Sequence, residues 1–426
     1  MGSDTSKKMP EDVFIVGIYS TPAGEFPELS PKSLVRAAYA GALADARVDG
    51  ANIGQVWFSN MMLDFWGQHN VKGQVCLMPL MEEGLLPAGT PITNVEGACA
   101  SASFAFHGAW KDILSGQCDL SLAIGMEKMH TPSRQAELIA RTAKCTDALN
   151  PEMCEQLYKR TAAELGGQFD LGSGCVAPAD IFALWARSHM ARYGTTTRQM
   201  ALAAAKSFAN SVDNPRAQYR FPMDADSVLS DQTVSSPLTR SMCAPVGDAA
   251  AAALLCSGSY LKGMPASVRR RAIRVRGHAI ASGRMKADWE SDRAPVLAAR
   301  HAYRIAQATP KEIDVVEVHD ATSFEEIHIL EDLGFCRRGE GGPFTASGAT
   351  QRKGQLPVNP SGGLVSRGHP IGATGLMMLN ELCIQLRGEA ASMQVPKART
   401  GLALNGGGLL GNDFAACAVT ILDRVN

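Results

Sequence analysis

Cys99 stands in a setting that suits covalent chemistry. It follows a short extended run, Ile92–Val95, and precedes an apolar segment rich in Ala and Phe, Ala100–Trp110, while Gly97 permits a sharp turn between the two. This order predicts that Cys99 lies at the N-terminus of a helix, where unpaired amide groups and the positive end of the helix dipole favour a thiolate. We therefore expect the pKa of the Cys99 thiol to fall from about 8.5 towards neutrality, which would make the sulfur a nucleophile. The competing interpretation is an unreactive cysteine, since free cysteine is among the most buried residue types.

Two histidines in the second half of the chain are candidate partners for this sulfur. His319 follows an apolar run, Ile313–Val318, and the C-terminal ends of strands in an α/β sheet face the ligand crevice. His369 lies within Gly-His-Pro-Ile-Gly-Ala-Thr-Gly, residues 368–375, where the glycines indicate close approach of the backbone to another group. An imidazole titrates near neutrality, so His369 could take the proton from Cys99 and later return it. Taken singly, either ring could instead be a hydrogen-bonded core histidine.

A third segment, Leu404-Asn405-Gly406-Gly407-Gly408, offers backbone chemistry. Amide N–H groups in such a glycine run can bind a developing oxyanion. On its own, the same run is also typical of a tight turn at the end of a strand.

The composition disfavours several classes of partner and site. The 426 residues carry 41 Lys and Arg against 42 Asp and Glu, for a net charge of -1 without a basic block, so we expect neither nucleic acid nor a membrane as a partner. The 11 cysteines include no Cys-x-x-Cys pair, which is typical of a reducing compartment and offers no recognisable metal site. No signal-peptide core or bilayer-length apolar stretch is evident, so we expect a cytoplasmic protein.

The elements that position these residues occur in two similar series. The expected strand, helix and strand are Val13–Ile18, Ser33–Asp45 and Ile53–Ser59 in the first series, and Ala272–Gly277, Ala294–Ala308 and Ile313–Val318 in the second. Ala302-Tyr303 echoes Ala38-Tyr39, with a four-residue difference in the connection that follows. Each series then reaches a candidate catalytic segment and another helix, which is Gly372–Leu386 in the second half. The sequence therefore predicts an α/β protein built from two βαβ-type halves of one duplicated design.

The segment 127–245 has no counterpart in the second half. Its best helical pieces are Ala179–Arg192 and Thr197–Ser211. An insertion of this size at the end of a strand normally covers a site or holds a substrate. We accordingly divide the chain into the first part of an N-terminal domain, an inserted loop domain, the remainder of the N-terminal domain and a C-terminal domain, at residues 1–126, 127–245, 246–270 and 271–426.

Together these segments resemble the thiolase superfamily, and specifically its branch related to the thiolase domain of sterol carrier protein. The resemblance covers nearly the whole chain and implies a duplicated five-layered αβαβα fold with an inserted loop domain. It also implies coenzyme A thioesters as substrates, no tightly bound cofactor, and a homodimer or tetramer. By the same resemblance Cys99 carries the acyl group, His369 activates the sulfur and His319 helps to stabilise a thioester oxyanion. The backbone N–H groups of Cys99 and Gly406 would form the second oxyanion hole.

The sequence departs from this family at two positions. Thiolases use a second cysteine as the acid and base at the α-carbon, usually in a Cys-x-Gly motif where this chain has Leu404. The sterol-carrier branch supplies it from a His-Asp-Cys segment, where this chain has Ala321. Neither side chain can move a proton, and loss of a general base lowers a rate on the order of 10²–10⁴-fold.

Three outcomes are compatible with these residues. The first is an acyltransferase whose carbon acceptor is already activated, such as a β-keto acid that loses carbon dioxide or an electron-rich ring. The second is a 3-ketoacyl-CoA thiolase or acetyl-CoA acetyltransferase in which His319 acts as the base. The third is a carbon–carbon lyase or non-catalytic subunit that works beside a small partner subunit. A binding or scaffold protein is the rival from another class, but a scaffold has no need of a glycine-wrapped imidazole.

Two further interpretations concern the surroundings of the site. Phe104, Phe106 and the segment Met61–Trp66 are candidate walls for an acyl pocket, although each is equally compatible with the core. Asn359 is a candidate for orienting His369.

Overall fold

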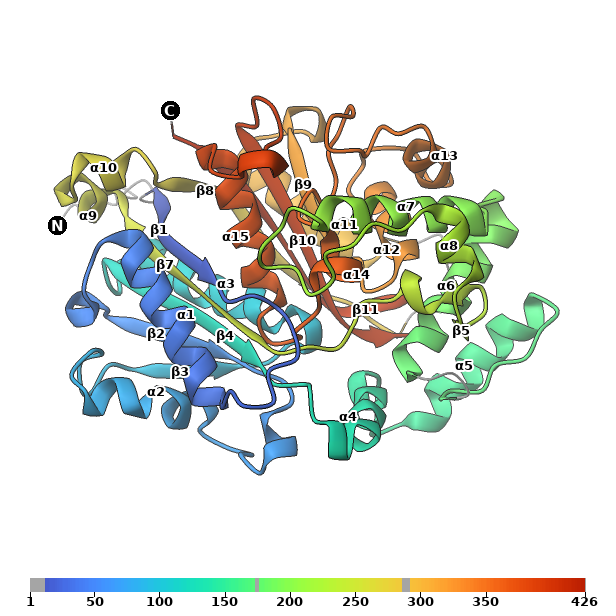
Figure 1. Cartoon of the computed structure of the whole chain (residues 1–426), viewed down its shortest axis with the longest axis horizontal. Helices are drawn as coiled ribbons and strands as arrows, with labels where there is room; N and C mark the ends of the chain where they lie inside the picture. Colours follow the sequence, from blue (N-terminus) through green and yellow to red (C-terminus); the bar gives the residue numbers. More distant parts are fainter. Residues whose placement is uncertain (1–11, 173–175, 286–291, 426) are drawn as a thin grey trace, which may run out of the picture.

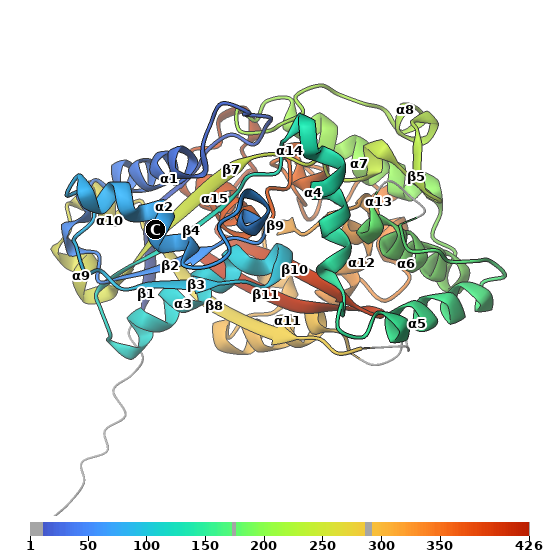
Figure 2. The same ribbon diagram turned by 90° about the horizontal axis from the view of Figure 1, so that it is seen from below.

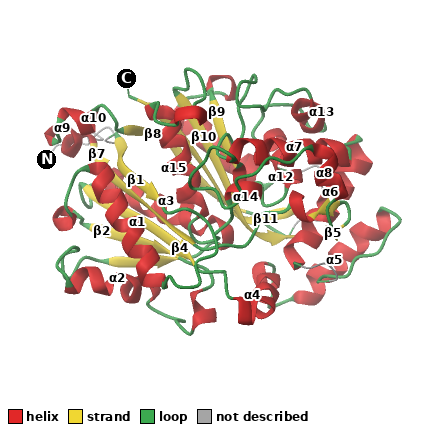
Figure 3. Ribbon diagram, viewed as in Figure 1, coloured by secondary structure: helices red, strands yellow, loops and turns green. Residues whose placement is uncertain are grey.

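The structure is a computed structural model that describes residues 12–172, 176–285 and 292–425. In these residues nine strands form one sheet in the order β3-β2-β4-β7-β1-β8-β11-β10-β9 (Figures 1 and 3). The strands are β1 Val13–Ser20, β2 Gln55–Ser59, β3 Ile92–Val95, β4 Leu120–Glu127, β7 Ala249–Ser257, β8 Ile273–Ser282, β9 Val315–Val318, β10 Thr400–Leu410 and β11 Asp413–Arg424. β1 and β8 pair through two residue pairs, Phe14 with Arg274 and Ile15 with Ile273. This short seam joins two half-sheets, one from each half of the chain.

Both faces of each half-sheet are buried, because the strands carry apolar residues at successive positions. In β1, Val13 and Ile15 belong to a cluster in the middle of the molecule, whereas Phe14 and Val16 belong to a separate cluster on the outer side. β7 repeats this alternation, with alanine at most positions on both faces. Small residues on the strands leave room for helices to pack closely against them.

The helices complete five layers. Two helices cover the outer face of each half-sheet, and the remaining pair shares one hydrophobic cluster with the inner faces of both. The outer helices are α1 Pro31–Ala46, α2 Lys72–Glu82, α11 Ala294–Ala306 and α12 Ser323–Asp332, and the middle pair is α3 Ser101–Ser115 and α15 Thr374–Arg387. Figure 1 shows α3 and α15 near the centre of the molecule. The predicted αβαβα arrangement is confirmed.

The two halves repeat at the level of single contacts. A Cβ atom added to Gly17 of β1 would lie 2.3 Å from the carbonyl oxygen of Ala42 in α1. A Cβ atom added to Gly277 of β8 would lie 2.7 Å from the carbonyl oxygen of Ala302 in α11. In both halves only glycine allows the helix to approach the strand this closely.

This match corrects one detail of the sequence comparison. With Ala42 aligned to Ala302, Tyr303 corresponds to Leu43 rather than to Tyr39. The predicted match between Ala302-Tyr303 and Ala38-Tyr39 is therefore wrong by one helical turn. The connection after the helix then has the same length in both halves. The two halves therefore match each other more closely than the sequence pattern indicated.

Between β4 and β7 the chain forms a group of five α-helices and a two-stranded sheet within the described residues. Its elements are α4 Gln135–Arg141, α5 Pro151–Glu164, α6 Ala177–Tyr193, α7 Thr197–Ser211, α8 Ala225–Ser230, β5 Thr233–Ser235 and β6 Leu238–Thr239. They lie beside the α/β layers, on the right in Figures 1 and 2. α7 has the predicted bounds. Its start is defined by a capping box that Thr196 and Gln199 form. Lys206 of α7 forms a buried ion pair with Glu326 of α12 at 2.9 Å, which anchors the inserted segment to the second half.

The remaining helices are short connections, namely α9 Gly258–Gly263, α10 Ala266–Arg269, α13 Gly341–Ala346 and α14 Gly363–Arg367. Across the described ranges, no helix combines the length and the apolar character that a bilayer span requires.

Candidate active site

Cys99 lies in the turn that leads from β3 into α3. The turn is a 3-10 segment, Ala98–Ala100, and α3 begins at Ser101. The Ser101 hydroxyl accepts a hydrogen bond from the Gly97 amide at 2.9 Å and donates one to the Ala98 carbonyl at 2.6 Å. Ala98 has a φ of 50°, in the left-handed region, whereas Gly97 has an extended φ of -162°. The turn places Cys99 at the N-terminal end of α3, as predicted.

The pKa of the Cys99 thiol is raised, which contradicts the expectation of a near-neutral value. Burial is the main cause, and Cys145, Glu96 and Glu127 disfavour an additional negative charge. Cys99 also packs against an apolar cluster that includes Ile371. The effect of the helix end is smaller than the loss of water around the sulfur. The resting residue is therefore a neutral thiol, and a base must remove its proton during attack.

His369 has the geometry of such a base. Its Nδ1 lies 2.8 Å from the hydroxyl of Thr374, and that hydroxyl donates its proton to the Pro370 carbonyl at 2.9 Å. The Thr374 oxygen must then accept from Nδ1–H, which leaves the lone pair of His369 on Nε2. Burial, reinforced by the charge of Arg367, lowers the pKa of His369 to about 3. The ring is thus a neutral acceptor across the physiological range.

His319 lies beside His369 and completes the cluster. The two rings are 5.0 Å apart between centroids at an angle of 79°, and the Nδ1 of His319 lies 3.0 Å from the Nδ2 of Asn405. One nitrogen or sulfur atom from each of Cys99, His319 and His369 lies within 4.8 Å of the other two. His319 is fully buried, and burial followed by the neighbouring His369 lowers its pKa well below the usual value. The structure therefore brings together the three side chains that the sequence singled out.

Glu127 was not anticipated and holds the loop after His369 in place. Its carboxylate accepts hydrogen bonds from the Gly372 amide at 3.0 Å, the Met61 amide at 3.0 Å and the Asn60 side chain at 2.7 Å. The Ser59 hydroxyl donates to the Gly372 carbonyl at 2.8 Å. Burial raises the pKa of Glu127 to about 7. A carboxylate at the last position of the otherwise apolar strand β4 was the sequence signal that could have revealed this clamp.

Asn359 has a different role from the predicted one. Its Oδ1 accepts a hydrogen bond from the Val318 amide at 2.8 Å, and its backbone amide donates to the Val316 carbonyl at 2.8 Å. No hydrogen bond within the described ranges joins its side chain to His369. Asn359 therefore fixes the end of β9, from which His319 projects, and the expectation that it orients His369 is wrong.

The glycine run of β10 lies directly against the cysteine turn. A Cβ atom on Gly407 would lie 2.1 Å from the Gly97 carbonyl and 2.9 Å from the Cys99 amide nitrogen. Gly406 packs instead on the ring of Phe414, with an added Cβ only 2.8 Å from it. Gly407 is thus the glycine that permits contact between the halves at Cys99, and the oxyanion role of the Gly406 amide stays a prediction.

The side chains of Cys99, His319 and His369 all line one cavity of about 790 Å³. Its wall is largely apolar and comes mostly from the segment between β4 and β7. Residues that contribute include Ile139, Cys145, Val176, Ala179, Phe182, Phe208, Tyr219, Phe221, Met223, Cys243, Ala321 and Phe414. Of the predicted pocket walls Met61 lines this cavity, whereas Phe106 lies in the central core. Leu404 is fully buried in the outer cluster of the second half, whereas Ala321 lines the cavity. Both side chains are hydrocarbons, so neither supplies an acid or base.

Two family profiles together match most of the chain. The profile of the thiolase N-terminal domain matches residues 13–259, and that of the thiolase C-terminal domain-like family matches residues 277–423. An acetyl-CoA acetyltransferase of Methanothermobacter thermautotrophicus is 35% identical, over 97% of this chain and 100% of that protein. Human sterol carrier protein 2 is 32% identical over 92% of this chain and 69% of that protein.

A solved structure described as an Ltp2-ChsH2(DUF35) aldolase has a similar fold. The TM-score between the two structures is 0.76 and their sequence identity is 20%. The matched region covers 97% of this chain and 98% of the aldolase chain. Both family profiles and the full-length relatives lead to one conclusion: the chain belongs to the thiolase family.

Proposed function

We propose that the protein is an acyltransferase that forms a thioester on Cys99 from an acyl-CoA and passes the acyl group to a carbon acceptor. The observation that carries the proposal is the convergence of Cys99, His319 and His369 within 4.8 Å at one cavity. The full-length similarity to a protein named acetyl-CoA acetyltransferase supports acyl-CoA as the substrate class.

In the first half-reaction, Sγ of Cys99 attacks the thioester carbonyl carbon while Nε2 of His369 takes the thiol proton. The amides of Cys99 and Gly406 and the ring of His319 stabilise negative charge on thioester oxygens. When the carbon–sulfur bond to coenzyme A breaks, the departing thiolate takes the proton back from His369. The products are free coenzyme A and an acyl group on Cys99.

In the second half-reaction, a carbon nucleophile attacks the acyl carbon and Cys99 leaves as a thiolate, which then takes a proton from solvent water. Leu404 and Ala321 supply no group to deprotonate an acceptor carbon. An acceptor that generates its own carbanion, such as a β-keto acid releasing carbon dioxide, needs no such group. We therefore propose a pre-activated acceptor, with a thiolase reaction through His319 as the alternative.

The quaternary arrangement and setting are also proposals. The family resemblance supports a homodimer or tetramer, with segment 127–245 as the loop domain over the substrate. The scattered cysteines without a Cys-x-x-Cys pair support a reducing compartment, which we propose is the cytoplasm. A carbon–carbon lyase beside a small partner subunit is a second candidate, because the aldolase of similar fold is named together with ChsH2(DUF35).

Mass spectrometry after incubation with acetyl-CoA tests the central step. We expect an acetyl adduct on Cys99, release of an equal amount of coenzyme A, and neither in a Cys99→Ala variant. A Cys118→Ala variant is the matched control, because that half-buried cysteine is outside the cavity lining. An unmodified Cys99 with no coenzyme A release would contradict the proposal.

A further inference from the structure

We infer that Asn405, held by Ser103, is a positioning residue that places the proton of His319 on Nε2, so that His319 is a hydrogen-bond donor to the substrate. The catalytic meaning of this inference rests on the proposed function. Its structural content rests on hydrogen bonds of the resting protein.

The first step concerns the atoms in contact. Nδ2 of Asn405 lies 3.0 Å from Nδ1 of His319, and an amide nitrogen can only donate. Nδ1 must therefore accept, and the proton of the neutral ring resides on Nε2. The ring is neutral because it is fully buried, which lowers its pKa.

The second step concerns the orientation of the Asn405 amide. Its Oδ1 accepts from the Ser103 hydroxyl at 2.8 Å. Gly375 packs directly against this oxygen and against Ser103. A Cβ atom added to Gly375 would lie 2.6 Å from the oxygen, 2.2 Å from the Ser103 hydroxyl and 2.8 Å from the Ser103 amide nitrogen. Ser103 lies in the first turn of α3 and Gly375 in the first turn of α15. The oxygen is thus placed between the N-terminal ends of the two middle helices, where unpaired N–H groups and positive dipoles favour an oxygen over an NH₂ group.

The third step compares the two histidines. Thr374 accepts from Nδ1–H of His369 and leaves a lone pair on its Nε2, whereas Asn405 donates to Nδ1 of His319 and leaves a proton on its Nε2. The site therefore holds one acceptor and one donor, both uncharged. A ring with a proton on Nε2 cannot take another from an acceptor carbon at that atom, so this assignment favours transfer over a thiolase reaction with His319 as base.

Nitrogen-15 NMR of the resting protein tests the assignment without any substrate. We expect His319 to show a proton on Nε2 and a bare Nδ1, and His369 to show the reverse. A His319→Asn variant identifies the signals of His319, and the buried His278, whose Nδ1 lies 2.9 Å from the Thr420 hydroxyl, serves as an internal reference. A proton on Nδ1 of His319 would overturn the inference.

An Asn405→Asp variant provides a functional readout. The carboxylate accepts a hydrogen bond, so it moves the proton of His319 to Nδ1 and raises the pKa of the ring. Donation from Nε2 then requires the charged ring, which is lost as the pH rises. Exchange of label between coenzyme A and acetyl-CoA should therefore fall about 10²-fold at pH 8, as for loss of an oxyanion donor, and recover partly at lower pH.

Two comparisons complete this test. The parent should show no such loss at high pH, and a Ser103→Ala variant should lose up to about tenfold at every pH because the amide is less firmly held. Profiles of the same shape for parent and Asn405→Asp would overturn the inference. Absence of an adduct on Cys99 in the parent would instead contradict the proposed function and leave the NMR result standing.

Discussion

Cys99 and His369 are both uncharged before substrate binds. The sequence placed the sulfur correctly at the end of a helix, but helix position alone gives the wrong direction for its pKa. Apart from Glu96, the groups that raise this pKa come from other parts of the chain, namely Cys145, Glu127 and most of the apolar cluster, which the local pattern does not report. In the proposed reaction, attack by Cys99 and removal of its proton would therefore occur together, since no thiolate is present in advance.

This neutrality can be observed directly. The difference in ultraviolet thiolate absorbance between the parent and a Cys99→Ala variant should stay near zero between about pH 6 and pH 9, because the raised pKa keeps the thiol protonated. Acylation should hold its rate as the pH falls from about 8 to 5, because the pKa of His369 is about 3 and the ring remains an acceptor. A thiolate signal at neutral pH would contradict the expected state.

Ala321 offers a second prediction on the scale of one residue. Ala321 lines the cavity. By the resemblance to the sterol-carrier branch, this is the position that would carry the second cysteine. An Ala321→Cys variant should raise the rate of acetyl-CoA condensation on the order of 10²-fold, because it supplies a proton carrier near the acceptor carbon. Ala321→Ser is the matched control, since a hydroxyl of similar size is a far weaker base. Equal condensation rates for parent and cysteine variant would show that the parent already has a proton carrier.

Single residues also show which parts of the site the sequence can predict. Cys99, His319 and His369 each lie in a glycine-marked or strand-terminal motif, so type and spacing were sufficient to find them. Asn405 lies in an apolar strand and Glu127 at the end of another, and their partners come from distant segments. Their roles depend on which residues meet in three dimensions.

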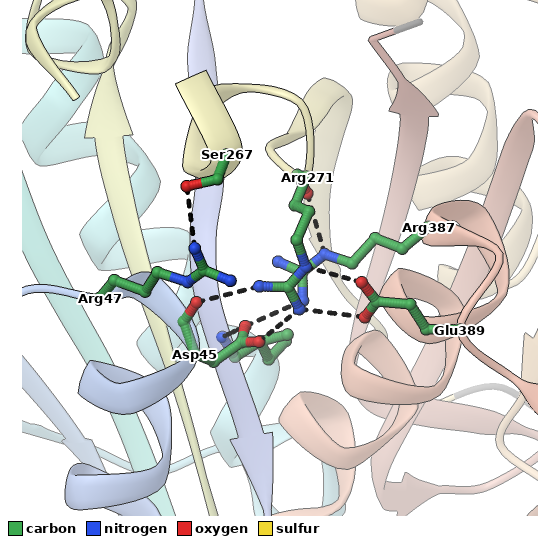
Figure 4. Close-up of polar contacts among 7 residues, drawn as sticks. Asp45, Arg47, Ser267, Arg271, Arg387 and Glu389 are labelled. Carbon is green, nitrogen blue, oxygen red and sulfur yellow. Dashed lines mark hydrogen bonds and ion pairs between the residues drawn. The ribbon is translucent and has the colours of Figure 1, made fainter. Parts of the chain in front are cut away.

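Among the elements, the C-terminal ends of α1 and α15 are joined by an ion network. Figure 4 shows Asp45 of α1 joined by dashed contacts to Arg271, which precedes β8, and to Arg387 of α15. The Asp45 carboxylate accepts from Arg271 at 2.7 Å, from Arg387 at 2.8 Å and from the Ile18 amide at 2.9 Å. Arg271 also pairs with Glu389 at 2.6 Å. The network connects the two halves close to the short β1–β8 seam.

An Asp45→Asn variant should lose about 2 kcal/mol in the free energy of unfolding, because it leaves the buried Arg387 without its carboxylate. Burial opposes ionisation of Asp45, but Arg387, Arg271 and the Ile18 amide together lower its pKa. The stabilisation is therefore present above the unfolded-state value of about 3.9 and is lost as the pH falls through the lower folded-state value. Denaturant unfolding at pH 7 and pH 3 should show the difference between parent and variant shrinking at the lower pH.

The exposed Arg36–Glu83 pair provides a control for this measurement. A Glu83→Gln variant should unfold at almost the same denaturant concentration as the parent, because solvent screens the pair. If Asp45→Asn behaved like Glu83→Gln, the network would contribute nothing to holding the halves together.

For the molecule as a whole, the cavity sets an expectation for the acyl group. Its volume of about 790 Å³ and apolar wall exceed what an acetyl group fills, even with part of the space occupied by the arm of coenzyme A. Each methylene buried contributes about 0.8 kcal/mol, so kcat/KM for acylation should rise about fourfold per added methylene until the cavity is full. Steady-state coenzyme A release with acyl-CoA substrates of increasing length measures this trend.

An Ala179→Phe variant should remove the preference for longer chains and spare acetyl-CoA, because Ala179 lines the wall of the cavity. Ala163→Phe is the matched control, since Ala163 is exposed and is outside the cavity lining. A flat dependence on chain length in the parent would show that acyl groups bind elsewhere.

The overall design was more predictable than the cavity. Two series of strands and helices, with Gly17 and Gly277 at matching positions, define the layers through local hydrophobic pattern. The cavity wall has no such pattern, because Phe182 of α6 meets Tyr219 and Phe414 in one wall only after the inserted segment folds against the second half.

The meeting of the first turns of α3 and α15 has a consequence for how activity can be controlled. Cys99 enters from one half, both imidazoles enter from the other, and Ser103 touches Asn405 across the boundary. A small shear along that boundary would separate the sulfur from both rings in a single movement. The candidate site is accordingly complete only where the two halves meet, and neither half contains it alone.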